Sequence, residues 1–129
     1  MSKRVKDLII IGAGQSALAC AYYLRRTDID YTILDASQQC GGSWNQYWDS
    51  LTLFSPAKHS SLPGWFMPPS KDRYPTREEV IDYLCKYEKK YNVPVERPVE
   101  VDSLHKENEL FTLKTSKGNV QSRAVISAT

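Results

Sequence analysis

The chain has 129 residues, enough for one domain, and its 17 Lys and Arg against 15 Asp and Glu leave a net charge of +2. No long block of like charge and no apolar run near the roughly 20 residues of a bilayer span occurs, so nucleic acid and membrane partners are not expected. The N-terminus runs directly into a predicted strand without the apolar region of a signal peptide, and we expect a cytoplasmic protein. Cys20, Cys40 and Cys85 form no C-x-x-C pair, which predicts three free thiols and no metal site.

Residues 5–35 carry the pattern of a strand, a helix and a second strand. Residues 5–11 are an apolar, β-branched run, typical of a strand buried on both faces of a parallel sheet. Residues 15–26 place apolar side chains at helical spacing and end in two arginines, which suit the negative end of the helix dipole. Residues 31–34 form the second strand, so the segment predicts a βαβ unit.

The turn between the first strand and the helix, residues 12–17, reads GAGQSA and fits the dinucleotide-binding pattern G-x-G-x-x-G/A. Gly12 permits the tight turn, Gly14 lets a diphosphate approach the backbone, and Ala17 allows the helix to pack close to the sheet. The unpaired amides of the first helical turn, which includes Gln15 and Ser16, form an anion site. These five residues are therefore candidate dinucleotide contacts.

Asp35 follows Gly14 by 21 residues and ends the second strand, where an acidic residue binds ribose hydroxyls. Its neighbour Ala36 is a further candidate contact. No arginine stands beside Asp35 in the sequence, so the 2′-phosphate of NADP would be repelled, and FAD and NAD remain. The alternative is an ordinary glycine turn in which Asp35 caps a helix or a turn.

Residues 36–75 show no sustained helical or strand period. They hold five of the seven prolines and all three tryptophans. Disordered segments are poor in aromatic residues, so we expect an ordered loop that covers a bound ligand.

A second helix is predicted to begin after Thr76, because Thr76 and Glu79 fit a capping box. Its predicted buried stripe consists of Val80, Ile81, Leu84, Tyr87 and Tyr91. Residues 99–104, 110–115 and 120–127 then alternate as strands around a turn at 116–119. The fold class is α/β: a Rossmann-like βαβ unit with a parallel sheet, a long aromatic-rich loop, a second helix and a C-terminal β-meander, forming one incomplete domain over residues 1–129.

Three segments together resemble one family: CGGSWNQYWDSLTLFSPAKHSSLPG at 40–64, YPTREEVIDYL at 74–84 and VISAT at 125–129. They are similar to the FAD-binding half of the flavin-containing monooxygenase-like flavoproteins, which are related to Baeyer-Villiger monooxygenases and include bacterial oxidoreductases. The resemblance covers nearly the whole chain and implies FAD as the cofactor.

The resemblance also implies positions for further cofactor contacts. The GG-[ST]-W turn would pass beside the ribityl chain and the diphosphate, with contacts from Gly42, Ser43 and Trp44. The SLTLFSP stretch would pack along the isoalloxazine, with Trp48, Thr52 and Leu53 near the ring. One strand after the second helix would contact adenine through its backbone at Val101, and the last strand would end at the dinucleotide with Ala128 and Thr129. For the aromatic residues, core packing is the alternative.

The resemblance implies the FAD-binding portion of an NAD(P)H-dependent flavoprotein monooxygenase or oxidoreductase. The family's NADPH domain is absent from this sequence, so we expect no turnover by this chain alone and assign no catalytic residue. Two alternatives stay open: a non-catalytic nucleotide-binding or assembly module, and the NAD-binding domain of a dehydrogenase. The substrate is not specified, and self-association or a partner chain is expected to complete the sheet.

Overall fold

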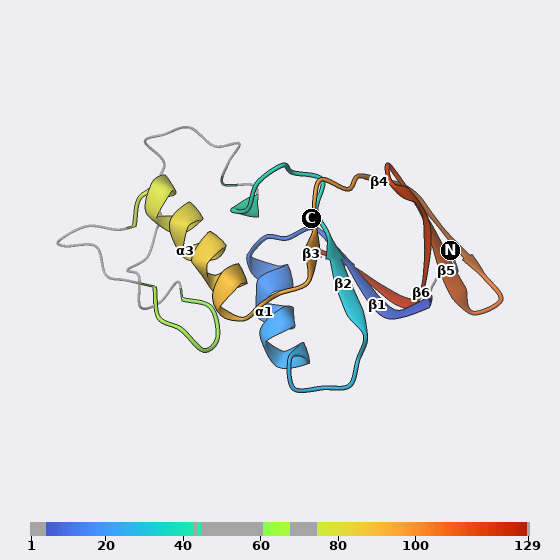
Figure 1. The fold of residues 1–129 in the computed structure, drawn as a ribbon, viewed down its shortest axis with the longest axis horizontal. Coiled ribbons are helices and arrows are strands. Elements are labelled where there is room, and N and C mark those ends of the chain that lie inside the picture. The colour runs from blue at the N-terminus through green and yellow to red at the C-terminus, as the bar shows by residue number, and fades with distance from the viewer. Residues whose placement is uncertain (1–4, 43, 45–60, 68–74, 129) are drawn as a thin grey trace.

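The computed structural model describes residues 5–42, 44, 61–67 and 75–128. In chain order the elements are β1 (Val5–Ile11), α1 (Gln15–Leu24), β2 (Tyr31–Leu34), α3 (Arg77–Lys90), β3 (Val95–Glu96), β4 (Val101–Glu107), β5 (Leu110–Thr115) and β6 (Gly118–Ser127). The strands form one sheet in the order β3-β2-β1-β6-β5-β4 (Figure 1). The predicted α/β fold with a βαβ unit and a β-meander is confirmed. The two-residue strand β3 was not predicted, because it is too short to show a period.

Strand β1 lies at the centre of the sheet, parallel to β2 on one side and to β6 on the other. Its side chains alternate between two apolar environments. Ile10 packs with α1 through Ala17 and Ala21, whereas Ile9 packs with Leu34 and Leu113 on the opposite face. Burial on both faces explains the continuous apolar run of β1.

Strand β6 belongs to two parts of the sheet. Residues 118–122 pair antiparallel with β5, and the parallel pairing with β1 begins at Gln121 and extends to Ser127. This shared strand brings the β4–β6 meander over the face of β1 that α1 leaves uncovered, where Val99 and Leu113 are buried (Figure 1). The central strands are therefore enclosed between helix and meander.

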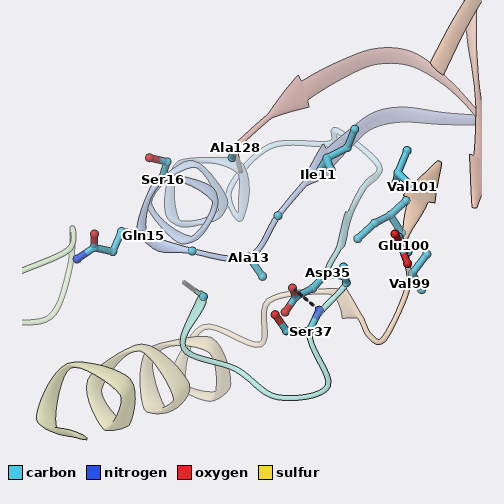
Figure 2. A pocket seen from close by; sticks show the side chains of 15 residues that line it. Ile11, Ala13, Gln15, Ser16, Asp35, Ser37, Val99, Glu100, Val101 and Ala128 are labelled. Carbon is cyan, nitrogen blue, oxygen red and sulfur yellow. Dashed lines mark hydrogen bonds between the residues drawn. The ribbon is translucent and has the colours of Figure 1, made fainter. Parts of the chain in front are cut away.

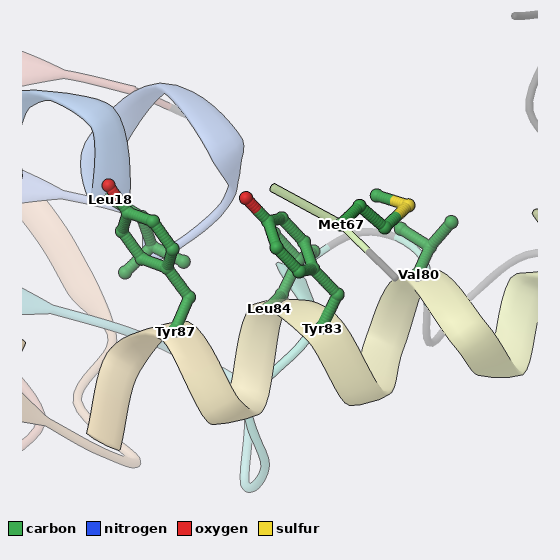
Figure 3. Close-up of a cluster of buried hydrophobic side chains, with 6 residues drawn as sticks. All are labelled: Leu18, Met67, Val80, Tyr83, Leu84 and Tyr87. Carbon is green, nitrogen blue, oxygen red and sulfur yellow. The ribbon is translucent and has the colours of Figure 1, made fainter. Parts of the chain in front are cut away.

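Helix α3 begins with the predicted capping box: the Glu79 amide donates to Thr76 Oγ1 at 3.2 Å, and the Thr76 amide donates to Glu79 Oε1 at 3.0 Å. Its buried side chains are Val80, Tyr83, Leu84 and Tyr87, which pack with Leu18 of α1 and with Met67 (Figure 3). Two residues of the predicted buried stripe are thus wrong, and one buried residue was not predicted. Ile81 and Tyr91 are only partly buried, whereas Tyr83 is fully buried.

The buried tyrosines of α3 hold residues 61–67 against the helix. The Tyr83 hydroxyl donates to the Trp65 carbonyl at 2.6 Å and accepts from the Leu62 amide at 2.8 Å. The Tyr87 hydroxyl donates to the Pro63 carbonyl. A phenol supplies both an apolar ring and a polar end, so this face of α3 can anchor an irregular segment whose backbone groups need partners.

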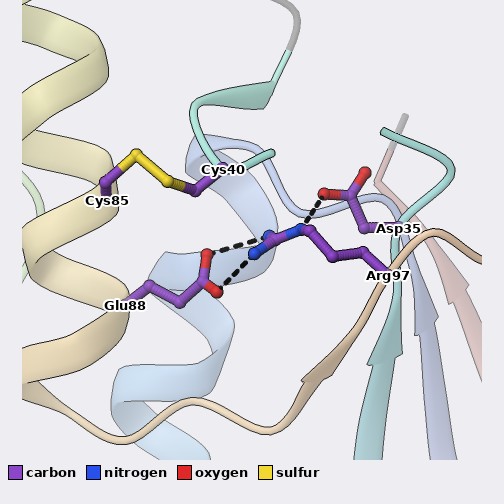
Figure 4. Close-up of a disulfide and its surroundings, with 5 residues drawn as sticks. All are labelled: Asp35, Cys40, Cys85, Glu88 and Arg97. Carbon is purple, nitrogen blue, oxygen red and sulfur yellow. Dashed lines mark hydrogen bonds and ion pairs between the residues drawn. A yellow bond between two sulfur atoms is a disulfide. The ribbon is translucent and has the colours of Figure 1, made fainter. Parts of the chain in front are cut away.

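Cys40 and Cys85 form a disulfide, with their Cα atoms 5.3 Å apart (Figure 4). The prediction of three free thiols is therefore wrong for this pair, and Cys20 is the free cysteine of the described residues. The two cysteines are 45 residues apart in sequence, and only the packing of α3 beside the loop after β2 brings them within bonding range.

No helix in the described ranges is long and apolar enough to cross a bilayer.

Candidate functional site

A pocket of about 550 Å³ opens at the carboxyl ends of β1, β2 and β6. Such an edge of a parallel sheet is the usual ligand-binding position in open α/β folds. Its described lining residues are Ile11, Gly12, Ala13, Gly14, Gln15, Ser16, Leu34, Asp35, Ala36, Ser37, Gly42, Val99, Glu100, Val101 and Ala128. In Figure 2, Asp35 lies between Ala13 on one side and residues 99–101 on the other.

One wall of the pocket is the glycine turn that opens α1. Gly12 has φ 99°, a conformation that suits glycine, and its amide donates to the Leu34 carbonyl at 2.8 Å. Gly14 is the N-cap of α1 and provides no side-chain hydrogen bond, and the first turn contains no acidic residue. Helix α3, by contrast, has both a capping box and acidic residues in its first turn. The amides at the start of α1 thus lack a side-chain cap and suit an anion.

The second glycine loop closes on the first. Among the described residues, a Cβ built on Gly14 would meet no atom within 4 Å, so these residues leave the space beside Gly14 open to a ligand. Gly42 has φ +58°, and a Cβ on it would lie 2.9 Å from the Gly14 Cα. Gly42 is therefore required for the close approach of the two backbones, which together border the space in front of α1.

The opposite wall is built around Asp35, whose side chain is 6% exposed. Asp35 Oδ1 accepts from the Ser37 amide at 3.1 Å, and Oδ2 accepts from Arg97 Nε at 2.7 Å. The terminal nitrogens of Arg97 donate to Glu88 at 2.7 and 2.9 Å, in a two-pronged contact (Figure 4). We refer to Asp35, Glu88 and Arg97 as the carboxylate–arginine triad.

The triad changes one premise of the sequence analysis. No arginine neighbours Asp35 in the sequence, but the fold brings Arg97 to it from 62 residues away. Burial lowers the pKa of Arg97, but the hydrogen bonds to Glu88 and Asp35 outweigh burial and raise it above the ordinary value. Two carboxylates and one guanidinium leave a net charge of −1. The exclusion of a 2′-phosphate stays a prediction, which now depends on this net charge and not on the absence of an arginine.

The segment after β3 completes this wall through backbone contacts. The Asp35 amide donates to the Glu96 carbonyl at 3.0 Å, and the Val99 amide donates to the Asp35 carbonyl at 2.7 Å. These bonds place residues 99–101 beside the end of β2. Val101, predicted from the resemblance to lie at adenine, lines the pocket together with Val99 and Glu100.

The structure brings most of the described predicted site residues into this pocket: Gly12, Gly14, Gln15, Ser16, Asp35, Ala36, Gly42, Val101 and Ala128. Ala17 lies below the glycine turn, fully buried against the sheet, as its predicted packing role requires. Trp44 is not a lining residue: it packs against the buried cluster of α3, and its carbonyl accepts from Arg77 Nε at 2.8 Å. The predictions for Ser43, Trp48, Thr52, Leu53 and Thr129 lie outside the described residues.

Several lining residues were missed by the sequence analysis: Ile11, Ala13, Leu34, Ser37, Val99 and Glu100. Ile11 and Leu34 are the last residues of β1 and β2, so the predicted strand ends could have indicated them. Arg97 and Glu88, which hold Asp35 from outside the pocket, gave no local signal, because a contact between the segment after β3 and helix α3 has no fixed spacing. Among the described residues, no group of three His, Cys, Asp or Glu side chains is arranged to hold a metal ion.

Three features define a dinucleotide-binding domain of the Rossmann type. They are a glycine turn at the end of a central parallel strand, a helix without a side-chain N-cap behind this turn, and an acidic residue after the second strand. The chain belongs to the family described as pyridine nucleotide-disulphide oxidoreductase, which matches residues 9–129.

Individual relatives agree with this assignment. The chain is 39% identical over 127 residues to an uncharacterized oxidoreductase CzcO-like of Geobacillus kaustophilus (strain HTA426), covering 98% of this chain and 36% of the relative. A flavin-containing monooxygenase from Stenotrophomonas maltophilia is 48% identical with a TM-score of 0.93, over 97% of this chain and 38% of that chain. A bacillithiol disulfide reductase from Staphylococcus aureus is 26% identical with a TM-score of 0.89, over 99% and 39%. The chain spans about a third of the length of the curated relatives it matches, and the resemblance to flavin monooxygenases is confirmed.

Proposed function

We propose that this chain is the FAD-binding portion of an NAD(P)H-dependent flavoprotein monooxygenase or related oxidoreductase. The observation that carries the proposal is the open space beside Gly14, which lies in front of the uncapped amides of α1 and is bordered by Gly42. A diphosphate fits this position because its charge suits a helix N-terminus and its bulk needs a glycine backbone. The site is therefore suited to the centre of a dinucleotide.

The other walls fit the adenosine end of FAD. Asp35 would accept hydrogen bonds from the ribose hydroxyls, and Val101 would contact adenine through its backbone. The amides at Gln15 and Ser16 would bind the diphosphate, with Gly12, Ala36 and Ala128 bordering the ligand. Contacts from Ser43, Trp44, Trp48, Thr52, Leu53 and Thr129 to the flavin side remain predictions from the family resemblance.

Bound FAD would supply hydride acceptance from a reduced nicotinamide and the activation of oxygen. The described residues bind and orient this cofactor, and we assign none of them a proton-transfer or nucleophilic role. NADPH does not suit this pocket, because the carboxylate–arginine triad carries a net charge of −1 beside the ribose position. NADPH would therefore act as the co-substrate at another site of the whole enzyme.

A partner strand completes the proposal. Residues 124–127 pair with β1, and the described residues supply no strand for their other edge, although β5 pairs with the preceding part of β6. An unpaired strand edge can accept another strand, either from a second copy or from another chain. The substrate of the whole enzyme is not assigned.

The test measures flavin binding by the 129-residue chain. We expect flavin absorbance that stays with the protein through gel filtration, and a melting temperature that rises with the FAD concentration. Gly14→Glu should abolish both effects while the chain remains folded, since its side chain would enter open space in the pocket with the wrong charge. Asn119→Glu makes the same charge change on an exposed hairpin and serves as the matched control.

Two outcomes would contradict the proposal. Tight binding of NAD without FAD would identify the NAD-binding domain of a dehydrogenase. Colourless protein stabilised by ADP but not by FAD would identify a non-catalytic nucleotide-binding module.

A further inference from the structure

The carboxylate–arginine triad lies directly behind the ribose position of the pocket. Asp35 lines the pocket, Arg97 contacts Asp35, and Glu88 on α3 contacts Arg97 from the far side (Figure 4). The side chains of Arg97 and Glu88 are 16% and 15% exposed, so this contact is largely shielded from solvent and salt. The three side chains come from the residue after β2, from α3 and from the segment after β3.

The backbone of Asp35 is held without the help of Arg97. Its amide donates to Glu96 and its carbonyl accepts from Val99, at 3.0 and 2.7 Å. The contact of the guanidinium with Asp35 Oδ2 at 2.7 Å therefore determines the orientation and charge of the carboxylate rather than the course of the chain. A charged carboxylate oxygen has about two acceptor positions. One described contact falls on each oxygen, which leaves acceptor capacity for two ribose hydroxyls.

Glu88 determines what else Arg97 can bind. Arginine has five N–H donors; three of them are used here, one on Asp35 and two on Glu88. The two-pronged contact with Glu88 occupies the edge of the guanidinium, formed by its two terminal nitrogens, that could otherwise bind a phosphate. It also adds a second negative charge, so that the triad as a whole repels an anion.

We propose, building on the FAD site proposed above, that Arg97 and Glu88 are positioning residues for the adenosine ribose. Arg97 orients the Asp35 carboxylate toward the ribose hydroxyls, and Glu88 prevents Arg97 from binding a 2′-phosphate. Discrimination between a free 2′-hydroxyl and a 2′-phosphate in this pocket is thus determined by a residue of α3 that does not line the pocket.

The test compares the affinities of two nucleotides, ADP and ADP carrying an additional 2′-phosphate, by isothermal titration calorimetry on the 129-residue chain. We expect the wild-type chain to prefer ADP. Glu88→Gln keeps the size of the side chain and removes its charge, so the preference should shift toward the 2′-phosphate by at least tenfold, equivalent to about 1.4 kcal/mol. Glu78→Gln makes the same charge change on an exposed part of α3 and should leave the ratio of the two affinities unchanged.

The ratio separates a positioning role from a merely structural one. Loosening of the fold would weaken the binding of both nucleotides equally. An equal loss of affinity for both nucleotides in Glu88→Gln, or a ratio of the two affinities within twofold of the wild-type ratio, would therefore overturn the proposal. Failure of the wild-type chain to bind either ADP or FAD would instead overturn the proposed function, and this inference with it.

Arg97→Lys provides a second test that does not depend on the folding of Glu88→Gln. Lysine keeps the positive charge but cannot contact both carboxylates in one plane. We expect about a tenfold weaker affinity for ADP and for FAD, with thermal melting used to confirm that the variant is folded. An unchanged ADP affinity in folded Arg97→Lys would show that Arg97 does not position Asp35.

Discussion

Alanine at the two pocket glycines should produce two different defects. Gly14 has φ −88° and open space beside it, so Gly14→Ala should leave the free energy of unfolding nearly unchanged. Its methyl group would occupy the proposed diphosphate position at an overpacking cost of about 1–3 kcal/mol, which weakens FAD binding about fivefold to 150-fold. Gly42→Ala should affect stability as well. Its left-handed backbone costs about 1–2 kcal/mol with a Cβ, and the contact with the Gly14 backbone costs about 1–3 kcal/mol more.

The assay pairs urea denaturation with FAD titration for each variant. Gly118→Ala is the matched control, because Gly118 also has a positive φ but has no atom within 4 Å of a built Cβ and lies in the distant hairpin. It should lose about 1–2 kcal/mol of stability and retain its FAD affinity. Equal destabilisation in Gly42→Ala and Gly118→Ala, with unchanged FAD affinity in Gly42→Ala, would refute the close approach of the two glycine loops.

Three further predictions concern the ribose contact, the disulfide and the buried tyrosines. Asp35→Asn should weaken FAD binding about tenfold in a fluorescence titration, since charged acceptors contribute about 1.5–3 kcal/mol per hydrogen bond, and an unchanged affinity would remove Asp35 from the site. Cys85→Ser should lower the free energy of unfolding by about 4 kcal/mol, because the disulfide closes a 45-residue loop and limits the entropy of the unfolded chain. A reductant should lower the free energy of unfolding of the wild-type chain to the same value, and an unchanged value would contradict the disulfide. Burial, together with neighbouring tyrosines, raises the pKa of Tyr87 above its usual value of 10.0, so the folded state keeps a proton that the unfolded state releases. The stability that this group contributes is therefore present below about pH 10 and lost as the pH rises further, and Tyr87→Phe should make the decline less steep in a denaturation series.

The parts of the fold with local signals were predicted from the sequence. The apolar run of β1, the glycine turn and the capping box of α3 each depend on neighbouring residues, and each lies where it was expected. The diphosphate side of the pocket follows from the same segment, because one short turn supplies both the glycines and the helix amides. The sequence therefore predicted which residues form this wall of the pocket, and their binding of a diphosphate stays a prediction.

The adenosine side could not be predicted in the same way. Asp35 was identified by its distance from Gly14, but its partner Arg97 and the more distant Glu88 are recognised only when α3 and β3 pack around β2. The disulfide has the same origin. Both interactions join residues that no helical or strand period relates, so the sequence analysis predicted a free thiol at Cys85 and gave no role to Glu88.

Two faces of helix α3 make specific contacts with other parts of the chain, and hydrophobic periodicity predicts only one of these faces. Tyr83 and Tyr87 face the buried cluster and hold residues 61–67. Cys85 and Glu88 are three residues apart, so they share another side of the helix, from which one bonds the loop that leads to Gly42 and the other holds Arg97. A shift of α3 would therefore move the glycine loop and the ribose carboxylate together. Helix α3 lines no part of the described pocket, but it connects the wall proposed for the diphosphate to the wall proposed for the ribose. Substitutions on this face should therefore alter nucleotide affinity without touching the ligand.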